Sequence, residues 1–130
     1  MGLIKGIAEI VLNVHDQQAA LRFYRDVLGL PVIGSVGPPG PIFLQAGPAQ
    51  VGIPAMIVLV PLPPGAGGFV APRTLHHLAL EVAPEEFDTM QQHLHDRGCA
   101  TRTGQHPVLP SRTLYVDDPD GNEVEIICTA

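Results

Sequence analysis

The sequence contains no tryptophan and is poor in aromatic and basic residues. Its seven Lys and Arg residues are scattered and are outnumbered by 13 Asp and Glu, which gives a formal net charge of −6. An acidic chain without a basic patch is a poor partner for nucleic acids and for anionic membranes. The lack of Trp and the aromatic content of 5% also argue against a groove that stacks flat ligands between rings.

Cysteine and long apolar runs are scarce as well. The two cysteines, Cys99 and Cys128, make neither a disulfide framework nor a CxxC site, which favours a reduced compartment. No uninterrupted apolar run approaches the roughly 20 residues of a membrane span, and the first residues lack a signal-peptide pattern. We therefore expect a cytoplasmic protein. A chain of 130 residues with 45% hydrophobic residues is long enough to form one domain with its own core.

The same order of strand and helix patterns occurs twice along the chain. In the first half, strands are predicted over residues 7–14, 31–36, 41–46 and 55–60. In the second half, they are predicted over residues 75–82, 100–104, 112–117 and 123–128. Each half has one helix after its first strand: the first covers about 17–28 behind the N-cap Asp16, and the second begins at Pro84. Gly29 and Gly98 end these helices.

These patterns predict an α+β protein built from two βαβββ modules. Module 1 covers about 5–60 and module 2 about 73–130, and a Pro/Gly-rich linker joins them at about 61–72. The offset between the modules is nearly constant: Glu9 and His77 are 68 residues apart (77 − 9).

Candidate metal ligands occupy matching positions in the two modules. Glu9 and His77 are the third residues of the matching first strands, and both lie on the less apolar face. Glu125 lies inside the last strand, which begins directly after the Asp118–Asn122 turn. The expected counterpart of Glu125 in module 1 is Val58. If the modules pair about a pseudo-two-fold axis, these four positions converge on one cleft.

Such a cleft would hold one imidazole and two carboxylates beside an apolar residue. These donors suit a divalent ion such as Fe(II), Mn(II), Ni(II), Co(II) or Zn(II). Three protein ligands leave coordination positions open for a substrate. Two carboxylates in one cavity would also repel each other unless one is protonated or a cation lies between them. The sequence therefore predicts a metal site at Glu9, His77 and Glu125.

Three segments resemble the vicinal oxygen chelate superfamily, which includes glyoxalase I, extradiol dioxygenases, fosfomycin resistance enzymes and bleomycin-binding proteins. They are residues 7–30, which end in FYRDVLGL, residues 76–82 (HHLALEV) and residues 114–126, which contain DPDGNEVE. The resemblance implies a glyoxalase-like fold, in which the two modules form an incomplete eight-stranded barrel with the helices outside. It implies the same three ligands, a small-molecule substrate and a homodimer, sometimes with sites shared between subunits.

The resemblance also suggests further site residues. Ring-cleaving relatives use a His and a Tyr near the metal that handle protons and polarise the substrate, which makes His106 and Tyr115 candidates here, and Glu9 or Glu125 is a candidate base. Arg112 is a candidate contact for an anionic substrate, and Val58 and Asn13 are candidate contacts on the module 1 side. At the ligand position of the first strand, members of the superfamily usually have His or Gln, whereas this sequence has Glu9. Val58 departs from the carboxylate of glyoxalase I, so the three-ligand layout is nearer to that of extradiol dioxygenases.

Three functions remain open from the sequence. The first is a metal-dependent enzyme, a lyase, isomerase or ring-cleaving dioxygenase, whose substrate chelates the metal through two vicinal oxygens. The second is a metal-free protein that binds an antibiotic or metabolite without turning it over. The third is a scaffold whose site has lost activity, an alternative that the unusual Glu9 keeps open.

Overall fold

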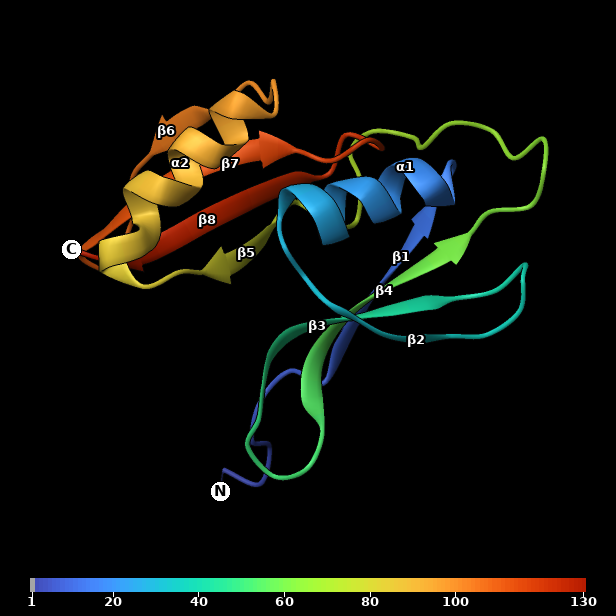
Figure 1. Cartoon of the computed structure of the whole chain (residues 1–130), viewed down its shortest axis with the longest axis horizontal. Helices are drawn as coiled ribbons and strands as arrows, with labels where there is room; N and C mark the ends of the chain where they lie inside the picture. The colour runs from blue at the N-terminus through green and yellow to red at the C-terminus, as the bar shows by residue number, and fades with distance from the viewer. Residues whose placement is uncertain (1) are drawn as a thin grey trace. The chain divides into compact units, whose positions relative to one another are not determined.

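The computed structural model describes residues 2–130. Their contacts divide the chain into two compact units, with the boundary in the sequence between Gly67 and Gly68. Each unit has the predicted βαβββ order, with one four-stranded sheet and one helical segment (Figure 1). In the part of the chain that the structure describes, every helix is too short or too polar to cross a membrane.

The first unit carries the strand order β1-β4-β3-β2. Its strands are β1 (Glu9–Val14), β2 (Val32–Ser35), β3 (Ile42–Ala49) and β4 (Pro54–Pro61). Strands β1 and β4 are parallel, with Glu9 beside Met56 and Val11 beside Val58. The alternation of side chains therefore places Glu9, Val11 and Asn13 on the same face as Val58.

The helix of the first unit matches its predicted span but changes its winding along the way. It starts as α1 (Gln17–Leu21), where the Asp16 carboxylate accepts the backbone N–H of Ala19 at 3.0 Å, and it continues as a π-helical segment (Arg22–Val27). The N–H of Leu28 bonds five residues back to the carbonyl of Phe23. Gly29 then takes a φ of +81°, a conformation that favours glycine, so the predicted stop is confirmed.

The second unit repeats this plan with the order β5-β8-β7-β6. Its elements are β5 (Leu78–Glu81), a 3₁₀ turn (Pro84–Glu86), α2 (Phe87–Asp96), β6 (Arg102–Gly104), β7 (Ser111–Asp117) and β8 (Glu123–Thr129). Helix α2 lies along one face of the sheet (Figure 1). Its buried Phe87 and Leu94 share the apolar side of this unit with Leu114, Val116, Val124, Ile126 and Cys128.

The first strand of this unit is shorter than predicted. Pairing of β5 with β8 begins only at Leu78 opposite Val124, so His76 and His77 precede the strand and are exposed. Residues 118–122 before β8 form a turn and offer no strand partner. The alternation of side chains therefore directs His77 to the same sheet face as Ala79, although its backbone is not paired with β8.

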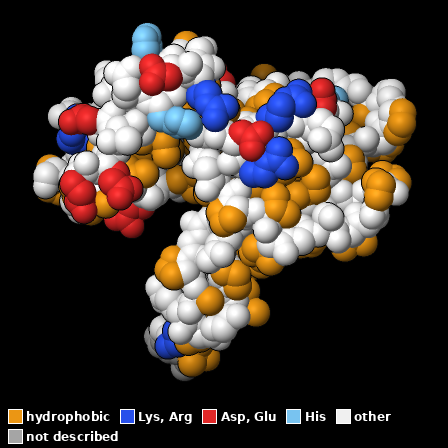
Figure 2. All heavy atoms as spheres, viewed as in Figure 1, with side chains coloured by type: hydrophobic (Ala, Val, Ile, Leu, Met, Phe, Trp, Pro, Cys, Tyr) orange, Lys and Arg blue, Asp and Glu red, His pale blue; other side chains and the backbone are white. Residues whose placement is uncertain are grey.

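The first unit also exposes an apolar surface. Hydrophobic side chains gather where its N-terminal segment and the β3–β4 hairpin lie, at the bottom of the view in Figure 2. Leu3, Ile4 and Val51 are 76%, 86% and 72% exposed, respectively. Apolar surface left in water at this extent marks a place where a partner or ligand can bind.

Candidate functional site

The second unit gathers the polar groups of the candidate site on the sheet face opposite α2. Glu125 on β8 lies between Ala79 of β5 and Tyr115 of β7 in the strand register. His77 lies two residues before Ala79 and so has the same parity. The small side chain of Ala79 leaves room beside Glu125, and the His77 ring reaches across to it.

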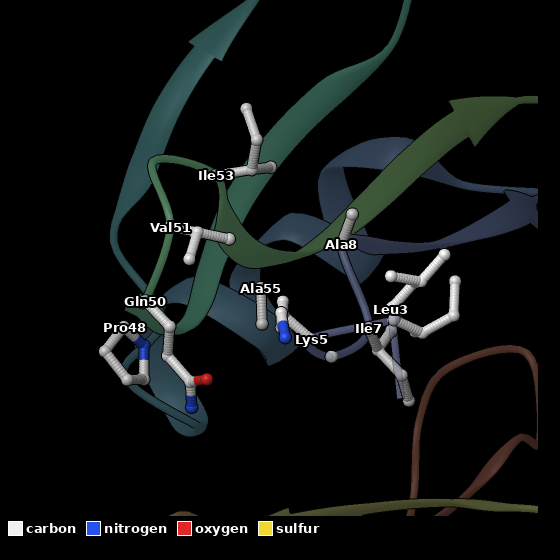
Figure 3. Close-up of a pocket in the computed structure, with 11 residues that line it drawn as sticks. Leu3, Lys5, Ile7, Ala8, Pro48, Gln50, Val51, Ile53 and Ala55 are labelled. Atoms are coloured by element: carbon white, nitrogen blue, oxygen red, sulfur yellow. The ribbon is translucent and has the colours of Figure 1, made fainter. Parts of the chain in front are cut away.

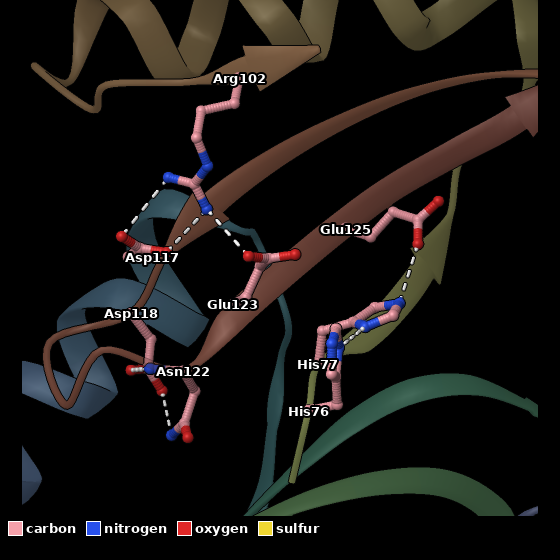
Figure 4. A network of polar contacts seen from close by, with 8 residues as sticks. All are labelled: His76, His77, Arg102, Asp117, Asp118, Asn122, Glu123 and Glu125. Atoms are coloured by element: carbon pink, nitrogen blue, oxygen red, sulfur yellow. Dashed lines mark hydrogen bonds and ion pairs between the residues drawn. The ribbon is translucent and has the colours of Figure 1, made fainter. Parts of the chain in front are cut away.

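His77 and Glu125, two of the three predicted metal ligands, are in direct contact. The Nε2 atom of His77 lies 3.2 Å from Oε1 of Glu125 (Figure 4). The Glu125 side chain is 4% exposed and that of His77 35% exposed, so the pair joins a buried carboxylate to a ring that solvent reaches. Among the described residues, no hydrogen-bond partner reaches the other carboxylate oxygen, Oε2, which is also buried.

Neighbouring carboxylates on this face already have a cation. The guanidinium of Arg102 lies 2.9 Å from Asp117 and 3.3 Å from Glu123, two residues before Glu125 (Figure 4). The hydrogen bond from Arg102 to Asp117 is the main reason why the pKa of Arg102 is raised. Asp117 and Glu123 are thus neutralised near the surface by a guanidinium, whereas Glu125 pairs with the imidazole of His77.

A hydrogen-bonded turn sets where β8 and its carboxylate begin. The Oδ1 atom of Asp118 accepts the N–H groups of Asp120 and Asn122 at 2.9 and 2.8 Å, and its Oδ2 accepts the Asn122 side-chain amide at 2.9 Å. Arg73 donates to the Asn122 side chain at 3.0 Å and to the Asp120 carbonyl. Sequence reasoning recognised the turn but missed Arg73, which lies 49 residues before Asn122.

Tyr115 flanks the pair from the β7 side. Its ring centroid lies 6.1 Å from that of His77, with the two rings at 78°. Gly104 on β6 makes room for this ring, because a Cβ atom there would clash with Cε2 of Tyr115. The structure therefore brings Tyr115 to the predicted site, and it adds Gly104 as a residue that sequence reasoning missed.

Two other predicted site residues have local roles in the structure. Arg112 lies on the α2 face, where it donates to Asp88 at 2.8 Å and covers the Phe87 ring at 4.3 Å, so it is not on the Glu125 face. The alternation of β7, in which Arg112 shares parity with Leu114 and Val116, was the signal for this. His106 accepts the N–H groups of Val108 and Leu109 at 3.1 and 3.0 Å through Nδ1 and so organises its own loop.

Glu9, Asn13 and Val58 belong to the first unit. The register confirms that Val58 stands beside Val11 as Glu125 stands beside Ala79, which are equivalent places in the two sheets. Glu9 and Asn13 are exposed on β1, and Val58 is buried. The convergence of Glu9 with His77 and Glu125 stays a prediction.

The donors at hand fit part of a divalent-metal site. Ligand atoms bound about 2.0–2.2 Å from one ion lie roughly 3 Å apart in adjacent coordination positions, and the contact between His77 and Glu125 measures 3.2 Å. The buried Oε2 atom of Glu125 offers a further donor. Within residues 2–130, however, no three His, Cys, Asp or Glu side chains gather closely enough to hold an ion.

The first unit has an apolar cleft of about 530 Å³ between its N-terminal segment and the β3–β4 hairpin (Figure 3). Ile7, Val51, Ile53 and Ala55 contribute to its walls, and Lys5 is the one charged residue that lines it. Its lining includes neither a carboxylate nor an imidazole, so the cleft suits an apolar group but offers no metal ligands of that kind.

Comparisons with known proteins agree with this architecture. The sequence matches the family model described as the Glyoxalase/Bleomycin resistance protein/Dioxygenase superfamily over residues 6–126. A glyoxalase/dioxygenase from Nostoc punctiforme is similar in structure, with 26% identity, a TM-score of 0.74 and coverage of 99% of this chain and 94% of that chain. A search of curated proteins gave no significant match.

Two further structures are similar over nearly their full length. The fosfomycin resistance protein FosX from Listeria monocytogenes has 20% identity and a TM-score of 0.71, with 98% of this chain and 96% of that chain covered. TnmS3, an antibiotic-binding protein from Streptomyces sp. CB03234, has 22% identity and a TM-score of 0.68, with both chains covered completely (100% and 100%). Together with the family match, these likenesses show the predicted glyoxalase-like α+β fold.

Proposed function

Because the chain belongs to the Glyoxalase/Bleomycin resistance protein/Dioxygenase superfamily, we propose that it is a metal-dependent enzyme whose substrate chelates a divalent ion through two vicinal oxygens. The observation that carries this proposal is the buried Glu125 carboxylate. One of its oxygens lies 3.2 Å from His77, and the other has no hydrogen-bond partner among residues 2–130. A buried oxygen left without a donor costs stability, and a bound cation would offset that cost.

In this proposal, Nε2 of His77 and the Glu125 carboxylate hold the ion, and Glu9 is the third ligand. The ion, one of Fe(II), Mn(II), Ni(II), Co(II) or Zn(II), supplies Lewis-acid chemistry and an attachment point for the substrate oxygens. Tyr115 orients the substrate from the β7 side, and Asn13 and Val58 contact it from the first unit. Glu9 or Glu125, once released from the ion, would take up the proton that the substrate loses, as lyase or isomerase chemistry requires. With Fe(II), the same ligand set suits ring-cleaving dioxygenation.

Anaerobic purification followed by elemental analysis tests the proposal. The wild-type protein should retain or take up one divalent ion per site, and both His77→Phe and Glu125→Gln should lose it. Glu123→Gln is the matched control, because it changes a carboxylate on the same strand and face whose partner is Arg102. Equal metal content in all four proteins would refute the assignment of the ligands.

Metal-free binding of a small molecule is the second candidate function. One observation favours it: the apolar cleft of the first unit is lined by uncharged residues except Lys5. The likeness to the antibiotic-binding protein TnmS3 points the same way. Calorimetry with candidate antibiotics in the presence of a chelator separates the two functions, since tight binding without metal favours the binding protein.

We further propose that the protein is a cytoplasmic homodimer. The apolar surface of the first unit supports the dimer, because Leu3, Ile4 and Val51 are 76%, 86% and 72% exposed. Light scattering coupled to size exclusion should give twice the chain mass of 13.8 kDa. A monomer at all concentrations would contradict the proposal.

A further inference from the structure

Three side chains of the second unit form a chain of contacts from the surface to the buried carboxylate (Figure 4). The Nδ1 atom of exposed His76 lies 2.8 Å from Nδ1 of His77, and Nε2 of His77 lies 3.2 Å from Oε1 of Glu125. The two imidazole rings meet edge to face, with centroids 5.0 Å apart. Both nitrogens of His77 therefore have a partner, and His76 is the partner of the nitrogen that faces away from Glu125.

These distances decide where the protons lie when both imidazoles are neutral. An ionised carboxylate only accepts, so the ion-pair contact of 3.2 Å with Oε1 of Glu125 favours a proton on Nε2 of His77. A neutral imidazole has one proton, so Nδ1 of His77 is then an acceptor. The contact of 2.8 Å between the two Nδ1 atoms needs one donor, which must be Nδ1–H of His76.

A metal ligand needs the opposite arrangement in His77. If Nε2 serves as a ligand, its lone pair must be free, and the single proton of the neutral ring must lie on Nδ1. That N–H needs an acceptor. His76 can provide one at the same place, because its Nδ1 has a free lone pair when its own Nε2 carries the proton.

We propose that His76 is the positioning residue of His77. It donates to Nδ1 of His77 while the Nε2–H of His77 faces Glu125, and it accepts from Nδ1–H when Nε2 is a ligand. The proton count of the pair is the same in both arrangements: one proton leaves Nε2 of His77 for solvent, the His76 proton crosses to Nδ1 of His77, and His76 takes one proton from solvent on Nε2. The second arrangement rests on the proposed metal site, and the first does not.

Nitrogen NMR of the two histidines reads both arrangements directly. In metal-free protein at about pH 8, where free imidazoles are neutral, His76 should be protonated on Nδ1 and His77 on Nε2. Addition of Zn(II), which is diamagnetic, should reverse both assignments. This readout requires no knowledge of the substrate or the reaction.

Three variants separate the role of the nitrogen from that of the ring. His76→Phe keeps the edge-to-face ring contact but removes the polar atom, and it should weaken Zn(II) binding about 10–100-fold, as loss of a ligand's hydrogen-bond partner does. His76→Asn keeps an amide atom near the place of Nδ1 and should bind Zn(II) nearly as tightly as wild type. His95→Phe on α2 is the control for loss of an exposed imidazole.

The outcomes distinguish this inference from the proposed function. If metal-free His76 is protonated on Nε2, or if His76→Phe binds Zn(II) as tightly as wild type, the positioning role is refuted while the metal site stands. If the metal-free assignments are as expected but Zn(II) changes neither ring, the metal site is refuted and only the first arrangement of His76 survives.

Discussion

Replacement of Glu125 by leucine should stabilise the metal-free protein, although Glu125 is the centre of the proposed site. The reason is the environment of its side chain, which is 4% exposed and has one buried oxygen without a hydrogen-bond partner among the described residues. A leucine of similar size removes this oxygen and keeps the volume filled. A residue retained for ligand binding at the expense of stability behaves in this way.

The expected magnitude follows from two opposing terms. Removal of a buried unsatisfied polar group stabilises by about 1–3 kcal/mol. The lost contact with His77, whose side chain is 35% exposed, is worth less than about 1 kcal/mol because solvent screens it. The net gain is about 1–2 kcal/mol, which raises Tm by about 3–8 °C for a domain of this size.

Urea denaturation and thermal unfolding in a chelator measure the effect. Glu123→Leu is the matched control, since Glu123 lies on the same strand and face but is 36% exposed and paired with Arg102. It should change stability little. With Mn(II) in excess the order should reverse, because bound metal stabilises wild type by an amount that grows with the logarithm of the metal concentration relative to Kd and does not stabilise Glu125→Leu.

A loss of more than about 1 kcal/mol in metal-free Glu125→Leu would contradict this reasoning, because a loss of that size is expected when a buried polar group is satisfied and structural. Glu125 would then serve the fold, as Asp118 does in the turn before β8.

Three further predictions concern the residues that hold the site in place. Arg73→Ala removes the hydrogen bonds to Asn122 and Asp120 and should cost about 1–3 kcal/mol in urea denaturation, whereas Arg22→Ala, at an exposed position on the first helix, should cost less. Asp118→Ala removes three hydrogen bonds of the same turn, so it should cost about 2–4 kcal/mol and weaken metal binding. Asp118→Asn keeps an acceptor oxygen and should recover part of the stability. Equal losses in both variants would refute the turn's role. Gly104→Ala should displace the Tyr115 ring and lower the stability by about 1–3 kcal/mol. Because the only tyrosines of the sequence are Tyr24 and Tyr115, the near-UV circular dichroism should change. An unchanged spectrum would show that the ring does not depend on Gly104.

The fold could be predicted well because its signals are local. Asp16, Gly29 and Gly98 marked helix boundaries through capping and positive φ, and the structure has φ values of +81° and +76° at the two glycines. The change to π-helical winding at Arg22 was not predictable from apolar spacing, which indicated an α-helix with Tyr24 and Leu28 on its apolar stripe; the structure buries both and also Phe23. The late start of β5 depends on where β8 begins, which is a long-range property.

The site was predictable only where strand parity decides it. The alternation in β8 and the module repeat brought together Glu125 and His77, and cross-strand register added Tyr115. The same parity would have excluded Arg112 from this face. The roles of His76, Arg73 and Gly104 depend on side-chain conformations and on neighbours distant in sequence, so composition and spacing carried no signal for them beyond the adjacency of His76 to His77.

Crystals grown with Mn(II) and measured at a wavelength where manganese scatters anomalously provide the most direct test of the central claim. The account predicts one strong anomalous peak within about 2.3 Å of both Nε2 of His77 and a carboxylate oxygen of Glu125, with Glu9 as the third protein ligand. It would be contradicted by crystals in which His77 and Glu125 remain in direct contact and manganese binds elsewhere or nowhere.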